Sequence, residues 1–173
     1  MRAMILPGYA RHEPFTSDID DVPKFTVTRR VSFTPQQIFA VVADVGCYKD
    51  FLPLVEHSTV RNRKPQVSDL ENFGADLVIG YRKMGIRESF SSVVESDAAN
   101  LTVRAISTGN AVKKLASSWR IVPIGENKSD ITFAVDYEMK SFMLQMLLGG
   151  MFESLVDKIM AAFEARAGQL YNN

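Results

Sequence analysis

The sequence holds few residues with the chemistry that catalysis at neutral pH requires. It has two histidines, His12 and His57, and a single cysteine, Cys47. His57 falls in a predicted strand, where adjacent side chains point to opposite faces of a sheet, so it shares no face with Glu56 or Ser58. A metal site built from several histidines has no second histidine to draw on in the body of the chain. We interpret His57 as an ordinary, half-buried strand residue.

Carboxylates and the thiol offer no better catalytic arrangement. Glu88 and Glu95 fall at odd spacing in one predicted strand and therefore face opposite sides. Cys47 has one sequence-local cation, Lys49, and we interpret it as a small half-buried residue. The motifs G-x-S-x-G and G-x-G-x-x-G and the phosphate-binding loop do not occur in the sequence. The sequence predicts no catalytic residue, no catalytic cofactor and no metal ligand; proton transfer by a lone buried carboxylate stays open.

Composition narrows the class of protein further. The 173 residues carry 20 basic and 20 acidic side chains, a balance that argues against a nucleic-acid binder, DNA included. A hydrophobic fraction of 46% and a mean hydropathy of -0.03 exclude a disordered chain and a polytopic membrane protein. The longest apolar stretch, 142–152, is too short to span a bilayer. We expect a bacterial protein of the cytoplasm, with peripheral contact at the inner face of the cytoplasmic membrane as an alternative.

The chain divides into an arm and one domain. Residues 1–23 combine several prolines with an acidic cluster and are predicted to form an irregular N-terminal arm, and residues 24–173 form the domain. Period-two alternation predicts a first strand over 24–32. Thr34 as N-cap and Gln37 in a capping box predict a helix that ends near residue 43. Asp44 is then expected to cap a second short helix, which ends near Pro53.

A long β region and one helix complete the predicted domain. Turn residues separate six candidate strands, over 55–63, 72–82, 86–96, 101–107, 115–122 and 131–139. From Leu144 to Phe163, apolar residues recur at steps of three and four, Met151 among them, which predicts a long amphipathic helix that Gly149 and Gly150 kink or delay. The predicted fold class is α+β: a seven-stranded, curved antiparallel sheet around a long C-terminal helix, with two short helices after strand 1 and an internal hydrophobic cavity.

Three local motifs, in this order and spacing, resemble a known family. Residues 41–45 (VVADV) lead into 48–53 (YKDFLP), residues 119–123 (WRIVP) lie in the sixth strand, and residues 162–167 (AFEARA) lie near the end of the last helix. Together they resemble the coenzyme Q-binding protein family, which includes the ribosome association toxins. That family belongs to the START-like, helix-grip superfamily, with polyketide cyclases and dehydrases. The resemblance covers residues 24–171.

The resemblance implies non-catalytic binding of ubiquinone or a related prenyl quinone or lipid, in a carrier or chaperone that supports respiration or quinone biosynthesis. A ribosome-interacting protein that blocks subunit association is an alternative, which the near-neutral charge disfavours. A cyclase or dehydrase is a further alternative, because fold does not imply function. The residues available to an anionic lipid or ribosomal RNA are Arg61, Arg63, Lys64, Lys113 and Lys114.

Large side chains on one face of the strands are the candidate binding residues in such a fold. The wall is predicted to comprise Leu77, Ile79, Tyr81, Phe90, Trp119, Phe133, Val135 and Tyr137. The lid is predicted to comprise Phe152, Leu155 and Ile159, and the entrance Tyr48, Phe51, Leu52 and Pro53. A satellite cluster that packs the short helices onto the sheet is the alternative for residues 48–54. Tyrosine and tryptophan offer a hydrogen-bonding tip on an apolar body, which suits a quinone carbonyl.

Overall fold

The structure, a computed structural model, describes residues 25–64 and 68–172, apart from the side chains of Leu144, Leu147 and Leu148. The predicted arm, residues 1–23, lies outside the described residues. The strands are β1 (Phe25–Val31), β2 (Val55–Arg61), β3 (Leu70–Tyr81), β4 (Ile86–Asp97), β5 (Thr102–Gly109), β6 (Val112–Gly125) and β7 (Lys128–Met139). The helices are α1 (Pro35–Ala43), α2 (Tyr48–Phe51) and α3 (Phe142–Tyr171), with 3₁₀ helices at Val45–Cys47 and Arg82–Met84.

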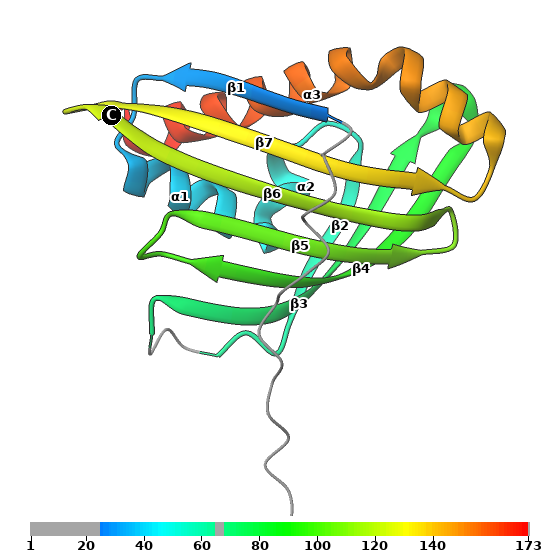
Figure 1. Ribbon diagram of the computed structural model, residues 1–173, viewed down its shortest axis with the longest axis horizontal. Helices are drawn as coiled ribbons and strands as arrows, with labels where there is room; N and C mark the ends of the chain where they lie inside the picture. The colour runs from blue at the N-terminus through cyan, green and yellow to red at the C-terminus, as the bar shows by residue number, and fades with distance from the viewer. Residues whose placement is uncertain (1–24, 65–67, 173) are drawn as a thin grey trace, which may run out of the picture.

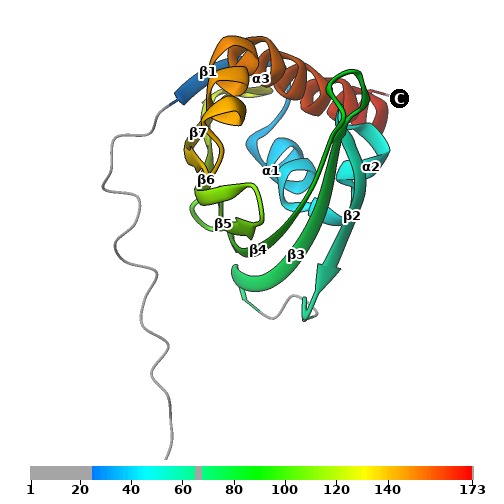
Figure 2. The same ribbon diagram turned by 90° about the vertical axis from the view of Figure 1, so that its right-hand side faces the viewer.

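The seven strands form one antiparallel sheet in the order β1-β7-β6-β5-β4-β3-β2. The first strand therefore pairs with the last, whereas β2 lies at the opposite edge (Figure 1). Viewed from the side, the sheet curves around the helices, and α3 lies across its open side (Figure 2). The predicted fold class is confirmed. Among the described strands, each chain-adjacent pair from β2 to β7 is a hairpin, whereas the pairing of β1 with β7 joins the first and last strands of the sheet.

The start of α1 follows the predicted capping pattern. The Gln37 N–H donates to Thr34 Oγ1 at 3.2 Å, and the Thr34 N–H donates to Gln37 Oε1 at 3.0 Å, which closes the capping box. Phe33 and Ile38, on either side of this box, are both buried. The helix therefore begins where its own residues satisfy the exposed N–H groups, and it ends at Ala43 as expected.

The predicted cap at Asp44 is wrong. Its side chain accepts no hydrogen bond from a backbone N–H of the 3₁₀ helix that follows, because the Cys47 N–H bonds instead to the Asp44 carbonyl oxygen at 3.1 Å. The pKa of the Cys47 thiol is raised, first by a hydrogen bond to the Asp44 carboxylate and then by burial. A thiol in this setting stays protonated at neutral pH, which is the opposite of what an activated cysteine requires.

The strands extend beyond several predicted boundaries. The largest difference is in β6, which begins at Val112 and not at residue 115, and which continues to Gly125. Register shifts between Val112 and Lys114 and between Pro123 and Gly125 interrupt the alternation there, so periodicity underestimates the strand. In contrast, β2 ends at Arg61, two residues before the predicted end.

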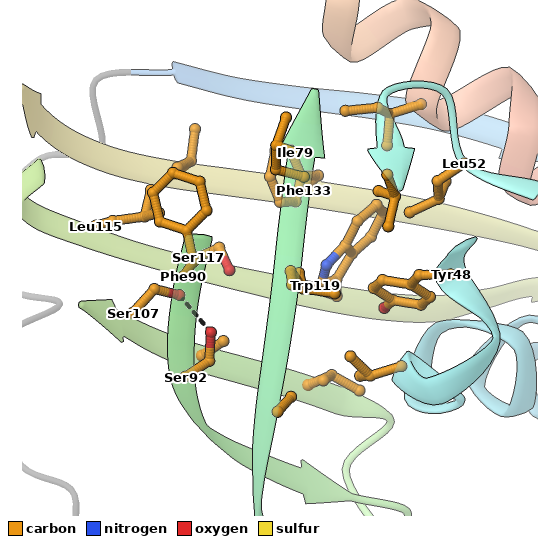
Figure 3. Close-up of a pocket in the computed structure, with 18 of the residues that line it drawn as sticks. Tyr48, Leu52, Ile79, Phe90, Ser92, Ser107, Leu115, Ser117, Trp119 and Phe133 are labelled. Atoms are coloured by element: carbon orange, nitrogen blue, oxygen red, sulfur yellow. Dashed lines mark hydrogen bonds between the residues drawn. The ribbon is translucent and has the colours of Figure 1, made fainter. Parts of the chain in front are cut away.

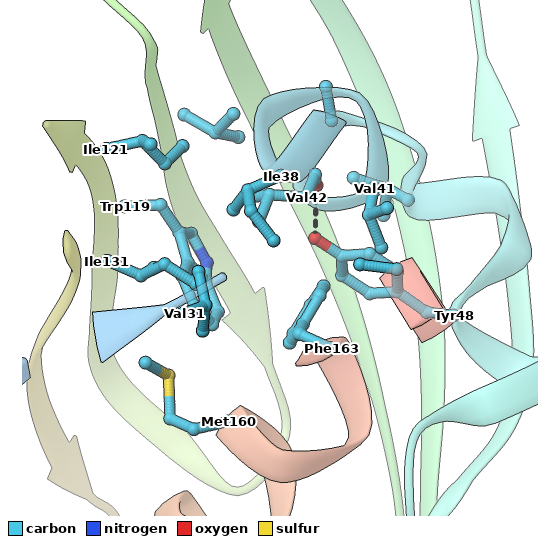
Figure 4. Close-up of a cluster of buried hydrophobic side chains, with 14 of the residues drawn as sticks. Val31, Ile38, Val41, Val42, Tyr48, Trp119, Ile121, Ile131, Met160 and Phe163 are labelled. Atoms are coloured by element: carbon cyan, nitrogen blue, oxygen red, sulfur yellow. Dashed lines mark hydrogen bonds between the residues drawn. The ribbon is translucent and has the colours of Figure 1, made fainter. Parts of the chain in front are cut away.

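The C-terminal half of α3 fills the centre of the core. The Phe163 ring lies at centroid distances of 4.7 Å from Trp119 and 5.4 Å from Tyr48 (Figure 4). Its centroid distance from the Phe51 ring is 5.3 Å. Val156, Met160 and Ala167 extend this buried face of the helix. On its flank, the Arg29 guanidinium of β1 forms an ion pair with Glu164 at 2.8 Å.

The N-terminal half of α3 differs from the prediction. The helix begins at Phe142, before Leu144, and continues without interruption through Gly149 and Gly150, so the predicted delay of its start is wrong. Met151, expected on the apolar stripe, is 41% exposed. At 100° per residue, Met151 lies on the opposite side of the helix from the buried row of Val156 and Met160.

Candidate functional site

A cavity of about 320 Å³ lies between the concave face of the sheet and α3. Its walls come from β3 to β7, its lid from α3, and one end from the segment around α2 (Figure 3). The volume is at the lower end of the range for small-molecule sites. Strand alternation explains the lining, because Leu77 and Ile79 of β3 and Phe133 and Val135 of β7 point to the same side of the sheet.

Most of the candidate binding residues line this cavity. They are Tyr48, Leu52, Pro53, Leu77, Ile79, Phe90, Trp119, Phe133, Val135, Phe152, Leu155 and Ile159. The helix and the strands therefore bring together side chains that are more than 100 positions apart in the sequence. Leu52 and Pro53 are half-buried, so residues 48–54 contribute both to the cavity wall and to the packing of α2.

Three candidate residues lie outside the cavity. Phe51 packs edge-on against Tyr48 and Phe163 and belongs to the core. Tyr81 is the last residue of β3 and lies beyond the part of the strand that lines the cavity. Tyr137 is buried and stacks on Phe152 at a centroid distance of 4.9 Å, so that it supports a lining side chain from outside the cavity.

Tyr48 and Trp119 differ in whether their polar groups are available to a ligand, although both were expected to offer a hydrogen bond. The Tyr48 hydroxyl donates to the Val42 carbonyl oxygen, and burial raises the pKa of this phenol far above its usual range. Its hydrogen is therefore committed to the protein. Trp119 is 7% exposed, and no described residue accepts a hydrogen bond from its indole N–H. Of the predicted aromatic donors, Trp119 alone lines the cavity with an uncommitted N–H.

Sequence reasoning missed the small residues of the wall. Ser92, Ser107 and Ser117 line the cavity, and the Ser92 and Ser107 hydroxyls lie 2.7 Å apart. Alternation held the necessary signal, since Ser92 is two residues from Phe90 and Ser117 is two residues from Trp119. The candidate wall residues were restricted to large side chains, and the serines were therefore not among them. Leu54, the last residue of the predicted entrance segment 48–54, also lines the cavity, and the other lining residues, which were not predicted, are Val45, Val55, Ala75, Val94, Val103, Arg104, Ala105, Leu115, Val156 and Phe163.

The acid–base residues do not gather around the cavity. Glu88 pairs with Ile79 and Glu95 pairs with Arg104, so the two carboxylates lie on opposite faces of the sheet, as predicted. His57 is exposed, and not half-buried as expected, next to a register shift in β2 that follows Val55. Within residues 25–64 and 68–172, no three His, Cys, Asp or Glu side chains group closely enough to hold a metal ion.

The basic residues considered for an anionic partner are largely paired. Four of them form ion pairs with a carboxylate of a neighbouring strand, which reduces the positive charge they present to solvent. The pairs are Arg61–Asp76 at 2.5 Å, Arg63–Glu71 at 2.8 Å, Lys113–Glu138 at 2.9 Å and Lys114–Asp136 at 2.6 Å.

A curved seven-stranded antiparallel sheet that encloses an apolar cavity against a long C-terminal helix defines a START-like, helix-grip domain. A START superfamily protein of Mycobacterium smegmatis shares this fold, with a TM-score of 0.67 and 21% identity over 84% of this chain and 97% of that one. The family described as polyketide cyclase/dehydrase and lipid transport matches residues 31–164. The chain belongs to that family.

Similar proteins carry two kinds of name. Ribosome association toxin RatA of Vibrio cholerae is 28% identical over 143 residues, 82% of this chain and 92% of that protein. Coenzyme Q-binding protein COQ10 homolog B of Xenopus laevis is 28% identical over 158 residues, 86% of this chain and 59% of that protein. An 18 kDa protein of Caulobacter crescentus superposes with a TM-score of 0.71 at 27% identity, over 86% of this chain and 98% of that one.

An aromatase/cyclase from Streptomyces sp. R1128 superposes equally well, with a TM-score of 0.71, but at 15% identity over 84% of this chain and 93% of that one, which shows the fold alone. No described helix is long and apolar enough to cross a membrane.

Proposed function

We propose that the protein binds a hydrophobic ligand without a catalytic step, and that this ligand is ubiquinone or a related prenyl quinone. The observation that carries the proposal is the cavity of about 320 Å³, whose lining is almost entirely aliphatic and aromatic. The name of the Xenopus relative, a coenzyme Q-binding protein, supports the choice of ligand. The protein would then act as a carrier or chaperone in respiratory electron transport or quinone biosynthesis.

The free energy of transferring a prenyl chain from the bilayer favours a carrier that releases its ligand over a protein that retains it tightly. Burial of a CH₂ group is worth about 0.8 kcal/mol relative to water, so each isoprene unit of a prenyl chain gains several times that amount. The chain's alternative environment is the lipid bilayer, which is as apolar as the cavity. Transfer between the two is thus nearly neutral for the chain, and the head group decides which lipid is held.

We also propose that the protein works at the cytoplasmic face of a membrane and contacts it through the start of α3. Phe142, Met143 and Met146 are 79%, 78% and 64% exposed in the first turns of α3, and further along the same helix Phe152 and Leu155 line the cavity. This surface is here called the α3 apolar face. Lys140, two positions before the helix, is exposed and suits an anionic head group.

Extraction of the purified protein with organic solvent, followed by mass spectrometry, tests the ligand. We expect a prenyl quinone enriched above its ratio to phospholipid in the host membrane. A Leu52→Glu variant, which places a charge in the cavity wall, should lose the quinone, whereas Val122→Glu on the exposed face of β6 should retain it. Empty wild-type protein, or phospholipid in membrane proportion, would contradict the proposal.

Ribosome association is the second candidate function. The observation in its favour is the 28% identity to the Vibrio cholerae toxin over 92% of that protein. Sedimentation with separated ribosomal subunits at moderate salt tests it, and absence of the protein from both subunit peaks would eliminate this candidate. The ion pairing of Arg61, Arg63, Lys113 and Lys114 weighs against it, since RNA contact depends on available positive charge.

A further inference from the structure

Three serine hydroxyls form a polar area in the wall of the apolar cavity. Ser92 of β4 and Ser107 of β5 are direct partners in the strand ladder, and their hydroxyls form a hydrogen bond of 2.7 Å. Ser117 of β6 pairs with Ala105 and is therefore the diagonal neighbour of Ser107. A hydroxyl offers one donor and two acceptor sites, so the Ser92–Ser107 bond leaves one hydrogen and several lone pairs unused.

The Trp119 indole N–H belongs to the same area. Trp119 follows Ser117 by two residues in β6, so both side chains point to the cavity side of the sheet. Figure 3 shows the indole nitrogen on the edge of the ring nearer to the serines. No described residue accepts a hydrogen bond from this N–H, and no fully buried side-chain nitrogen or oxygen of the described residues lacks a partner, so the N–H is accessible and can meet the contents of the cavity that Trp119 lines. A ligand oxygen would satisfy it.

The cavity offers no charge to balance an ionised head group. Among its described lining residues, Tyr48 and Arg104 are the two that carry an ionisable group. The Tyr48 hydroxyl is bonded to the Val42 carbonyl oxygen. Arg104 alternates with Val103 and Ala105, pairs with Glu95, and interacts electrostatically with Asp97, so its guanidinium lies on the outer face of the sheet. A carboxylate or phosphate at the serines would therefore be buried without a cation, which is costly.

We propose that Ser92, Ser107, Ser117 and the Trp119 N–H form a polar subsite that selects a neutral, oxygen-bearing head group. The Trp119 N–H donates to one ring oxygen and the serine hydroxyls donate to others, while the apolar remainder of the cavity holds the isoprenoid chain. This subsite rests on the proposed function, in that the occupant is a lipid, and it specifies the class: quinone-like lipids in preference to fatty acids and phospholipids.

Two variants remove the donors and leave the rest of the cavity wall unchanged, and the hydrocarbon probe used below accounts for the volume that Trp119→Phe adds to the cavity. Trp119→Phe keeps an aromatic ring in contact with Phe133 and Phe163 but lacks the N–H. Ser107→Ala with Ser117→Ala removes two hydroxyls, and Ser89→Ala, on the exposed side of β4, is the matched control. Thermal unfolding monitored by circular dichroism identifies any variant that fails to fold, and the two subsite variants serve as independent tests.

Calorimetric titration with three probes measures the selectivity: a ubiquinone with a two-isoprene chain, a hydrocarbon with the same chain and no head group, and oleate. We expect each subsite variant to weaken quinone affinity by about three- to tenfold, the effect of losing a neutral hydrogen bond, and to leave hydrocarbon affinity unchanged. An unchanged ratio of quinone to hydrocarbon affinity in both variants would overturn the subsite, as would tighter binding of oleate than of the quinone. Wild-type protein that binds none of the probes would overturn the proposed function itself.

Discussion

The Ser58 hydroxyl of β2 donates a hydrogen bond to the Gly46 carbonyl oxygen at 2.7 Å, in the 3₁₀ helix that precedes Tyr48. The same hydroxyl accepts from the Lys49 N–H at 3.0 Å, and Ser58 is 2% exposed. One small side chain thus joins the sheet edge to the segment that forms one end of the cavity. Because the site is buried, water cannot readily replace either bond.

Replacement of Ser58 by alanine should lower the free energy of unfolding by about 1–3 kcal/mol, the range for a buried polar group left without its partner. Ser89→Ala, at an exposed position of β4, should change it by less than about 0.5 kcal/mol. Urea unfolding of both variants measures the difference. Equal stability of the two would show that the Gly46 and Lys49 groups find other partners.

Two glycines should respond to alanine in opposite directions. A Cβ atom at Gly109 would lie 2.7 Å from the backbone oxygen of Ser89, whereas one at Gly149 would meet no atom within 4 Å. We expect Gly109→Ala to destabilise the protein by about 1–3 kcal/mol through strain in the β4–β5 pair. Gly149→Ala should stabilise it by roughly 0.5–1 kcal/mol, because alanine is the better helix former. Melting temperatures that shift in the same direction for both variants would contradict the prediction.

Stability should fall in acid partly through Asp76. The Ser91 hydroxyl and the Arg61 guanidinium hydrogen-bond to this carboxylate and lower its pKa from the ordinary value of 3.8. A lowered pKa means that the unfolded chain takes up the proton first, so the contribution is present above pH 3.8 and is lost as the pH falls through the folded-state pKa.

Asp76→Asn should therefore reduce the loss of stability between about pH 5 and pH 2, as measured by urea unfolding at each pH. Asp157→Asn, at an exposed position of α3, is the matched control. Identical pH profiles for Asp76→Asn and the wild type would show that the Ser91 and Arg61 contacts do not contribute in solution.

The α3 apolar face should determine membrane contact. Replacement of Phe142, Met143 and Met146 by serine should reduce sedimentation with vesicles of phosphatidylcholine and phosphatidylglycerol severalfold, because it removes apolar surface that is 64% exposed or more. The melting temperature should change little, since these side chains are not part of the buried core. Replacement of Val93 and Val122 by serine, on the outer face of the sheet, provides a control that removes exposed apolar side chains away from α3. Unchanged vesicle binding of the α3 variant would contradict membrane contact at this surface.

Local rules were sufficient for the elements of the fold. The capping box at Thr34 and Gln37 placed the first helix, and the turn signals separated the six strands from β2 to β7. They failed where a backbone group competed with a side chain, as at Asp44, and where register shifts broke the alternation, as at Val112. The resemblance identified the family because its motifs at residues 48–53 and 119–123 are contiguous in the sequence.

The sequence by itself determined which side chains share a face of the sheet, because alternation along a strand depends only on the local backbone. Only the tertiary structure decided which residues of that face meet the cavity. Trp119 and Tyr137 both lie on the inner face, yet α3 leaves the first beside the cavity and covers the second with Phe152. The tertiary structure also brings Ser92, Ser107 and Ser117 together from three strands. Both outcomes depend on the curvature of the sheet and the position of α3, which arise from contacts between residues far apart in the chain.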